Sequence, residues 1–231
     1  LFFIYFWLVI MPISYSLKNI SDESPHISTG IQVAAIFLVL LKKRVRLILA
    51  SIIITVMLLM IWFYRRPLNT IRDDIEINTL VSPAYGTIYR ILPVMKNGIQ
   101  YTHISIFLSP TDIHVQYIPL TSTFVETIYD ATGKFNLAYE MNKSDDNEKA
   151  ITTISDGKNN IYITQIAGFL VRRINTKPFK KGEKLKPGQE LGMIKFGSRV
   201  DIELPEEYNI LVKEGQYVRG PETIIAKVNL V

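Results

Sequence analysis

The pattern of hydrophobic residues changes in character near residue 65. Before that point, Leu47 to Tyr64 (LILASIIITVMLLMIWFY) form an apolar run of eighteen residues without a charge. A run of this length matches the thickness of a bilayer core, so the sequence predicts a transmembrane helix over 47–64. A polar connector over 65–78 follows, and beyond it the apolar residues recur at every second position in short segments.

These short segments are typical of β-strands, because successive side chains of a strand point to opposite faces of the sheet. Turn-forming Gly, Pro, Asn and Asp residues separate the segments. The sequence therefore predicts a mostly β domain over 79–231. The segments with the clearest alternation are 102–109, 113–117, 160–166 and 200–204.

The β region also contains an internal repeat. Residues 179–191 (FKKGEKLKPGQEL) resemble residues 211–223 (LVKEGQYVRGPET), with one residue of slippage at Pro187. Each copy has a glycine turn, an apolar residue three positions on, a basic residue and a second glycine turn. Repeats of this form build the paired hairpins of the barrel-sandwich (hybrid-motif) fold known from lipoyl and biotinyl domains. We therefore expect a duplicated barrel-sandwich domain.

The distribution of charge favours a membrane as the partner of this chain. The net charge is +5, and part of the excess consists of Lys and Arg residues on both sides of the predicted helix. Juxtamembrane basic residues usually face anionic lipid, but charge on both flanks leaves the topology open. The role of residues 1–46, which contain short apolar segments, is also open. Basic and aromatic residues do not interleave on one surface, so we do not expect nucleic-acid binding.

The residue types that are missing limit which nucleophiles, cross-links and metal sites the chain can have. The chain has no cysteine, which excludes disulfides, thiolate zinc sites and cysteine nucleophiles. His103 and His114 do not have a recognised metal-ligand spacing, so we expect no metal site.

One serine lies on the apolar side of an alternating segment. Apolar residues alternate through KFGSRVDIELP (195–205) and back to Ile194, which predicts one half-buried strand; Ser198 shares their parity and follows Gly197. A buried serine usually bonds a nearby backbone carbonyl. A serine oxygen can also attack the preceding peptide carbonyl, and elimination and hydrolysis then leave a pyruvoyl group on the new N-terminus. Glycine before the serine leaves room for such an attack.

Four segments in order resemble the short, archaetidylserine decarboxylase-like form of the phosphatidylserine decarboxylase family. The resemblance extends from the end of the predicted helix to the C-terminus. It implies a membrane-bound carboxy-lyase that converts phosphatidylserine to phosphatidylethanolamine. The segments are 81–87 (VSPAYGT), 104–115 (ISIFLSPTDIHV), 165–174 (QIAGFLVRRI) and 188–201 (GQELGMIKFGSRVD).

The resemblance also implies roles for particular residues. Self-cleavage between Gly197 and Ser198 would give a large β chain and a small α chain, held together by strand pairing. The pyruvoyl group made from Ser198 would form a Schiff base with the substrate amine and serve as the cofactor. His114 matches the histidine of the family and is expected to transfer protons. Arg172 and Arg173 match a family motif and are candidates to bind the lipid phosphate. The oligomeric state is open, a homo-oligomer included.

Tyr85 departs from the family pattern, which has an acidic residue at this position. Tyrosine, whose unperturbed pKa is about 10, supplies no negative charge near neutral pH. Loss of a carboxylate that orients a catalytic histidine can lower a rate about ten-thousandfold. One alternative is therefore a degenerate homologue that binds lipid without cleaving itself. A remote alternative is a lipoyl- or biotinyl-type carrier modified on Lys195, which lies between the two repeat copies.

Overall fold

A computed structural model describes residues 43–68, 70–76, 78–133, 146–168, 174–195 and 198–228, and for Ser198 the description covers the backbone. The chain divides into two compact units, Leu1–Leu68 and Asn69–Val231. The predicted N-terminal region 1–46 lies outside the described residues except for its last four.

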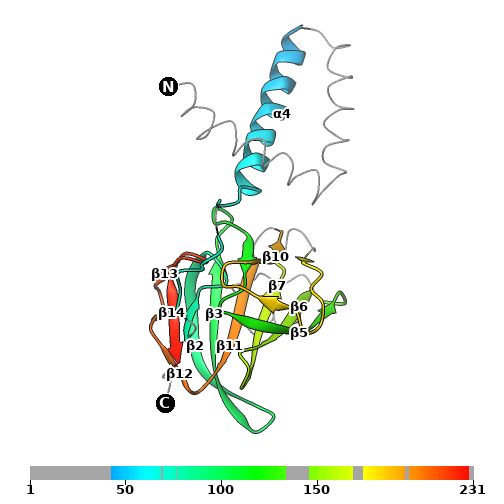
Figure 1. Cartoon of the computed structure of the whole chain (residues 1–231). Coiled ribbons are helices and arrows are strands. Elements are labelled where there is room, and N and C mark those ends of the chain that lie inside the picture. Colours follow the sequence, from blue (N-terminus) through cyan, green and yellow to red (C-terminus); the bar gives the residue numbers. More distant parts are fainter. Residues whose placement is uncertain are drawn as a thin grey trace. The chain divides into compact units, whose positions relative to one another are not determined.

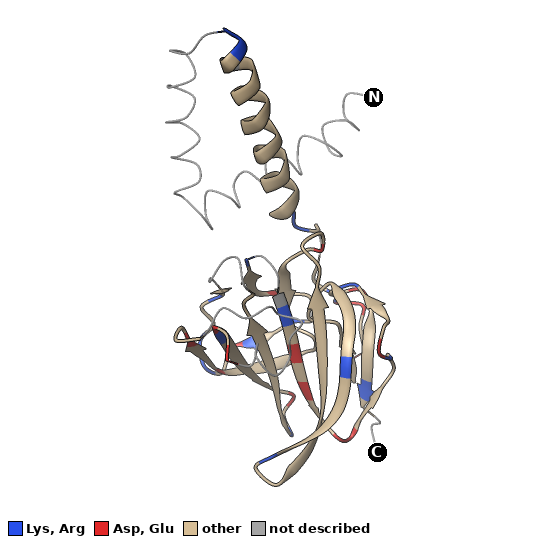
Figure 2. Ribbon diagram, turned by 180° about the vertical axis from the view of Figure 1, so that it is seen from behind, with Lys and Arg blue, Asp and Glu red and all other residues tan. Residues whose placement is uncertain are grey.

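The first unit contains one described helix, α4 (Lys43–Phe63). The helix begins before the predicted Leu47 because lysine and arginine are good helix formers, and Pro67 prevents a longer continuation. Its most apolar part has no side chain buried in protein, and the helix is long and apolar enough to cross a membrane. Basic residues lie at its start and just after its end, with none between (Figure 2).

The second unit is built from strands, which confirms the mostly β class. The described strands form two three-stranded sheets, β1-β14-β12 and β4-β10-β8, and one curled eight-stranded sheet, β13-β2-β3-β11-β7-β6-β5-β9 (Figure 1). The bounds of the strands are β1 Thr79–Val81, β2 Gly86–Lys96, β3 Ile99–Leu108, β4 Val115–Tyr117, β5 Ser122–Asp130, β6 Lys149–Ser155, β7 Asn160–Ile166, β8 Ile174–Thr176, β9 Lys184–Leu185, β10 Glu190–Ile194, β11 Ser198–Pro205, β12 Tyr208–Ile210, β13 Tyr217–Val218 and β14 Ile224–Val228.

Strand β11 lies inside the eight-stranded sheet and pairs antiparallel with β3 on one side and β7 on the other. Ile202 faces Ile104 of β3 and Ile163 of β7, and all three side chains are fully buried in the hydrophobic core. The opposite face of β11 is also buried near its start, where Arg199 is 2% and Asp201 4% exposed. The expectation of a half-buried strand is therefore wrong for this end of β11.

The alternation from Ile194 to Leu204 also does not belong to one strand. Strand β10 ends at Ile194 and pairs with β4 and β8, whereas β11 begins at Ser198 in the larger sheet. Every residue from Leu191 to Ile194 is buried, so the shared parity of Ile194 and Val200 does not indicate one continuous strand. The Gly197–Ser198 bond therefore falls on the connection between two sheets.

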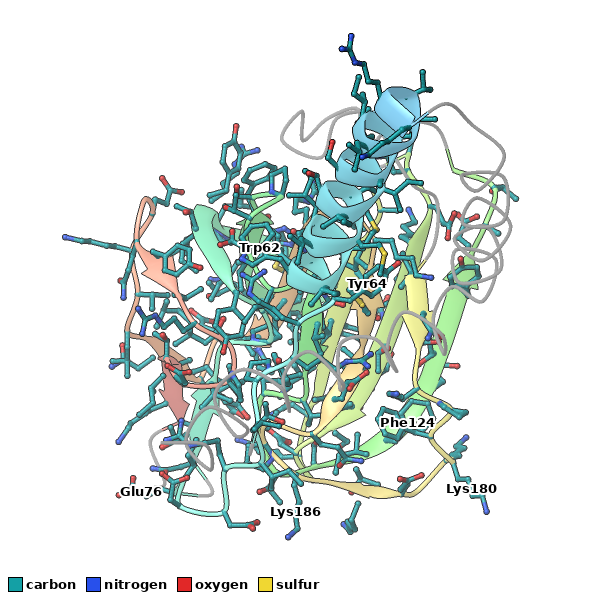
Figure 3. All side chains as sticks on the ribbon, turned by 90° about the horizontal axis from the view of Figure 1, so that it is seen from above. Trp62, Tyr64, Glu76, Phe124, Lys180 and Lys186 are labelled. Carbon is teal, nitrogen blue, oxygen red and sulfur yellow. The ribbon has the colours of Figure 1, made fainter. Side chains whose placement is uncertain are left out.

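The internal repeat corresponds to two similar structural modules. Gly182 and Gly215 both have positive φ values, 85° and 81°, in the turns that precede β9 and β13. Each turn exchanges two backbone hydrogen bonds with one residue of a long strand, Phe124 in the first copy and Ile88 in the second. Strands β9 and β13 then form the two edges of the eight-stranded sheet. Phe124 and Lys180 lie at the corner formed by the first copy (Figure 3).

Gly86 shows how closely the start of β2 packs against β3. Its φ is 155°, and a Cβ there would lie 2.3 Å from the Phe107 carbonyl oxygen of β3. We expect Gly86→Ala to lower the free energy of unfolding by at least about 2 kcal/mol, because backbone must move to admit the methyl group.

Gly98→Ala is the matched control for this prediction. Gly98 has a positive φ of 78°, but a Cβ there meets nothing within 4 Å. We expect a loss of about 1 kcal/mol from backbone strain alone. Equal losses for the two variants, measured by urea unfolding in detergent, would contradict the packing argument.

Candidate active site

The loop between β3 and β4, residues 109–114, joins the strands that flank the connection between the two sheets. At its start, Leu108 pairs with Ser198, the first residue of β11. At its end, Val115 pairs with Met193 of β10. The loop that carries Asp112 and His114 therefore joins the same two sheets as residues 195–197, although the two segments are distant in sequence.

The His114 imidazole is fully buried and held in one orientation. Its Nδ1 lies 2.9 Å from the carbonyl oxygen of Asp112, and the side chain has no exposed surface. A carbonyl oxygen can only accept a hydrogen bond, so Nδ1 carries the proton in this contact. In the neutral ring, Nε2 then holds a lone pair and can accept a proton, as a general base requires.

Hydrogen bonds to main chain and side chains fix the backbone around His114. Its carbonyl oxygen accepts hydrogen bonds from the Ile194 N–H at 3.2 Å and from Nε2 of Gln116 at 2.7 Å. The Gln116 Oε1 in turn accepts a hydrogen bond from Nε2 of Gln165 at 2.8 Å. Both glutamine side chains are fully buried, and Gln165 faces Val200 of β11. The network therefore connects β4, β7 and β10 to the histidine.

Asp112 orients His114 through its backbone, whereas its carboxylate closes the loop. Oδ2 accepts a hydrogen bond from the Ser109 N–H at 2.8 Å, and the Asp112 N–H donates to the Ser109 carbonyl at 2.9 Å. Oδ1 accepts a hydrogen bond from the Tyr217 hydroxyl at 2.7 Å. Asp112 therefore orients the His114 ring through its backbone carbonyl rather than through its carboxylate.

Tyr85 lies beside this region and is 7% exposed. Its ring packs edge-on against Tyr117 with a centroid separation of 6.3 Å, and the Tyr117 N–H donates to the Pro83 carbonyl. The Tyr85 hydroxyl lies 3.4 Å from Oε1 of Glu222. Burial, together with the negative charge of Glu222, raises the pKa of Tyr85 to about 12. The phenol is therefore uncharged near neutral pH, as expected from the sequence.

A buried ion pair follows Ser198 on β11. Nη2 of Arg199 lies 2.9 Å from Oδ2 of Asp201, and Asp201 also lies 3.5 Å from Nε2 of His103. Burial raises the pKa of the Asp201 carboxyl, although the Arg199 guanidinium opposes this shift. Because leaving either charge alone in the interior is costly, the pair fixes the start of β11.

The structure brings most of the predicted site segments together. Residues 81–87, the 104–115 segment and the strands on both sides of 195–197 meet around His114. The predicted cleavage residue Gly197 and the predicted phosphate ligands Arg172 and Arg173 lie outside the described residues. Lys195 is 3% exposed, in contrast to the accessible lysine that a carrier domain presents for modification.

Four polar residues of this region were not found from the sequence: Gln116, Gln165, Arg199 and Tyr217. Gln116 and Gln165 lie in alternating segments, where a single glutamine is not distinguishable from a surface residue. Arg199 lies on the polar parity of its strand, which usually faces solvent. Tyr217 belongs to a repeat copy and contacts Asp112 only after the chain has folded. Gln165 and Arg199 lie within the family-like segments 165–174 and 188–201, but no local signal assigned a role to any of the four.

Comparisons with known proteins identify the family of this chain. The family model described as phosphatidylserine decarboxylase matches residues 56–226. Three similar curated proteins are each described as "phosphatidylserine decarboxylase proenzyme". The protein of Chlorobium phaeobacteroides is 39% identical over 174 residues, 74% of this chain and 80% of the relative. That of Wolbachia pipientis wMel is 38% identical, over 74% and 76% of the two chains. That of Carboxydothermus hydrogenoformans is 36% identical, over 78% and 84%.

The family match covers well over half of the chain, and the segments that meet around His114 lie within it. The chain therefore belongs to the phosphatidylserine decarboxylase family, a family of carboxy-lyases.

Proposed function

We propose that this chain is a membrane-anchored proenzyme that cleaves itself between Gly197 and Ser198 and then converts phosphatidylserine to phosphatidylethanolamine. The observation that carries the proposal is the position of His114. It is a buried imidazole with its proton on Nδ1, on a loop that joins the strands flanking the cleavage site. Helix α4 would provide the anchor, which keeps the enzyme at the surface where its lipid substrate lies.

Self-cleavage needs only groups of this chain and one water molecule. Ser198 Oγ attacks the Gly197 carbonyl carbon, and the amide becomes an ester as the nitrogen of residue 198 takes up a proton. Loss of the Cα proton of residue 198 then breaks the ester bond, and Gly197 leaves as a carboxylate. Water adds to the remaining dehydroalanine, and ammonia is released. A base is needed at the first and second steps, and Nε2 of His114 is suited to this role.

The residues around position 198 fit a pyruvoyl group at this place. The backbone of residue 198 is paired with Leu108, and the following Arg199 is buried in an ion pair with Asp201. A new N-terminus would therefore be held in register with β3. When present, the pyruvoyl group supplies an electron sink for loss of carbon dioxide. His114 would donate or remove protons nearby, and water would be excluded by the buried side chains around it.

Strand pairing would keep the two fragments together after cleavage. The small fragment would contain β11, β12, β13 and β14. Of these, β11 bonds to β3 and β7, β13 bonds to β2, and β14 bonds to β1, all of which belong to the large fragment. The fragments therefore share two sheets and one core.

The cleavage can be tested by expressing the protein, isolating the membrane fraction and measuring the intact mass of the chain. We expect two fragments, with the smaller one spanning residues 198–231 and having a blocked N-terminus. Ser198→Ala should give only the full chain of 26.5 kDa. A wild-type chain that remains whole under all conditions would exclude the proposed mechanism.

His114→Gln tests the role of the imidazole, because the amide keeps a donor for the Asp112 carbonyl but is not a base. We expect cleavage to slow by at least about a hundredfold, the usual contribution of a general base. His103→Gln is the matched control, since His103 lies in β3, the strand before the His114 loop, and its ring is beside Asp201. Similar rates for both variants, followed by gel electrophoresis, would contradict the assignment to His114.

A second candidate function is a lipid-binding homologue that does not cleave itself, and Tyr85 is the observation that favours it. Its pKa of about 12 means that it lacks the negative charge of the family's usual acid. We expect Tyr85→Asp to accelerate cleavage, because a carboxylate would stabilise the protonated histidine. Tyr85→Phe should leave the rate within about twofold, since it removes one long hydrogen bond without a change in charge. A slower Tyr85→Asp variant with unchanged thermal stability would refute this explanation of position 85.

A further inference from the structure

Tyr217 makes a contact with the His114 loop that the family's chemistry does not explain. It lies in β13, and its backbone is held in register opposite Thr87 of β2. The side chain is 49% exposed, yet its hydroxyl donates a 2.7 Å hydrogen bond to Oδ1 of Asp112, which is 9% exposed. A hydrogen bond to a charged acceptor is stronger than one between neutral groups. The contact therefore fixes Asp112 from outside its own loop.

Asp112 connects Tyr217 to the imidazole by a short path. One carboxylate oxygen accepts the Tyr217 hydroxyl, and the other accepts the Ser109 N–H, so the side chain is held at both oxygens. The carbonyl oxygen of the same residue accepts Nδ1–H of His114. A movement of Asp112 would move the group that keeps the proton on Nδ1.

Both fragments of the proposed proenzyme hold the His114 loop. The Ile194 N–H, which bonds to the His114 carbonyl, belongs to the large fragment and lies three residues before the new chain end at Gly197. Tyr217 belongs to the small fragment, which would carry the group made from Ser198. Cleavage would free the chain next to Ile194 but would leave Tyr217 in place in its sheet.

We propose that Tyr217 is a positioning residue, which acts through Asp112 to keep the His114 imidazole aligned with the fragment that begins at residue 198. This inference rests on the proposed function and adds to it a residue outside the segments that resemble the family. Tyr217 holds the proton-transfer group in the same tautomer before and after cleavage, because its own strand pairing lies away from the cleaved bond.

Tyr208→Phe provides a matched control for Tyr217→Phe. Tyr208 lies in the same small fragment, and its hydroxyl donates a 2.7 Å hydrogen bond to Oδ2 of Asp156 in the large fragment. Asp156 lies in the turn between β6 and β7, and β11 pairs with β7 so that this turn is at the end of the sheet away from Ser198. The control therefore removes a bond of the same kind and length between the fragments, remote from His114.

The kinetic test compares these variants in the full chain. We expect Tyr217→Phe to slow self-cleavage about tenfold, the size expected for loss of one hydrogen bond to a charged group, whereas Tyr208→Phe stays within about twofold. In processed enzyme, kcat should fall with KM unchanged. An unchanged kcat with a raised KM would mean that Tyr217 contacts substrate, and it would overturn the positioning role. Tyr217→Phe added to Asp112→Ala should have no further effect, because alanine leaves no acceptor for the Tyr217 hydroxyl.

A spectroscopic test does not depend on activity. In the uncleavable Ser198→Ala chain, ¹⁵N chemical shifts of the histidine rings report which nitrogen carries the proton. We expect His114 to be in the Nδ1–H form and the Tyr217→Phe variant to show a mixture of forms, with Tyr208→Phe unchanged. A Tyr217→Phe spectrum identical to that of the parent would overturn the inference. Failure of the wild-type chain to cleave would overturn the proposed function, and the spectra would still decide the role of Tyr217.

Discussion

The two-sided pairing of β11 is the constraint on which the rest of the β unit depends. The strand is bonded along its length to β3 and over its first half to β7, so its register is fixed from both sides. A shift by one residue would exchange its two faces and move Val200, Ile202 and Leu204 out of the core. Because Ser198 is the first residue of this strand, the same register determines which part of the β3–β4 loop faces it.

The site combines this rigid strand with an unusual amount of buried polarity. His114, Gln116 and Gln165 are fully buried and linked by hydrogen bonds, and Arg199 and Asp201 form an ion pair on the other face of β11. Buried polar networks of this kind are costly when only partly satisfied, so they tolerate few alternative arrangements. They therefore define one geometry around the start of β11, which general acid–base chemistry requires.

The sequence predicted the class of the fold and named the segments of the candidate site, but it did not predict how these segments are assembled. Period-two alternation identified strand β7 and most of β3 and β11, because their apolar faces lie on a common core. It did not detect the break between Ile194 and Ser198, since Ile194 has the same parity as Val200 and Ile202 although it belongs to another strand. Local motifs also identified His114. The contacts from Gln165 and Tyr217 could not be predicted, because they depend on sheet order, which a linear pattern does not contain.

The proposed cleavage would place the two duplicated modules on different chains. The first copy, with β9 and β10, precedes the cleavage site, and the second copy, with β13 and β14, follows it. Each product chain would therefore inherit one copy, and the two copies would remain at opposite edges of a shared sheet. The mature protein would then carry two related modules on two separate chains. A reactive N-terminus would replace the peptide bond that joined these chains.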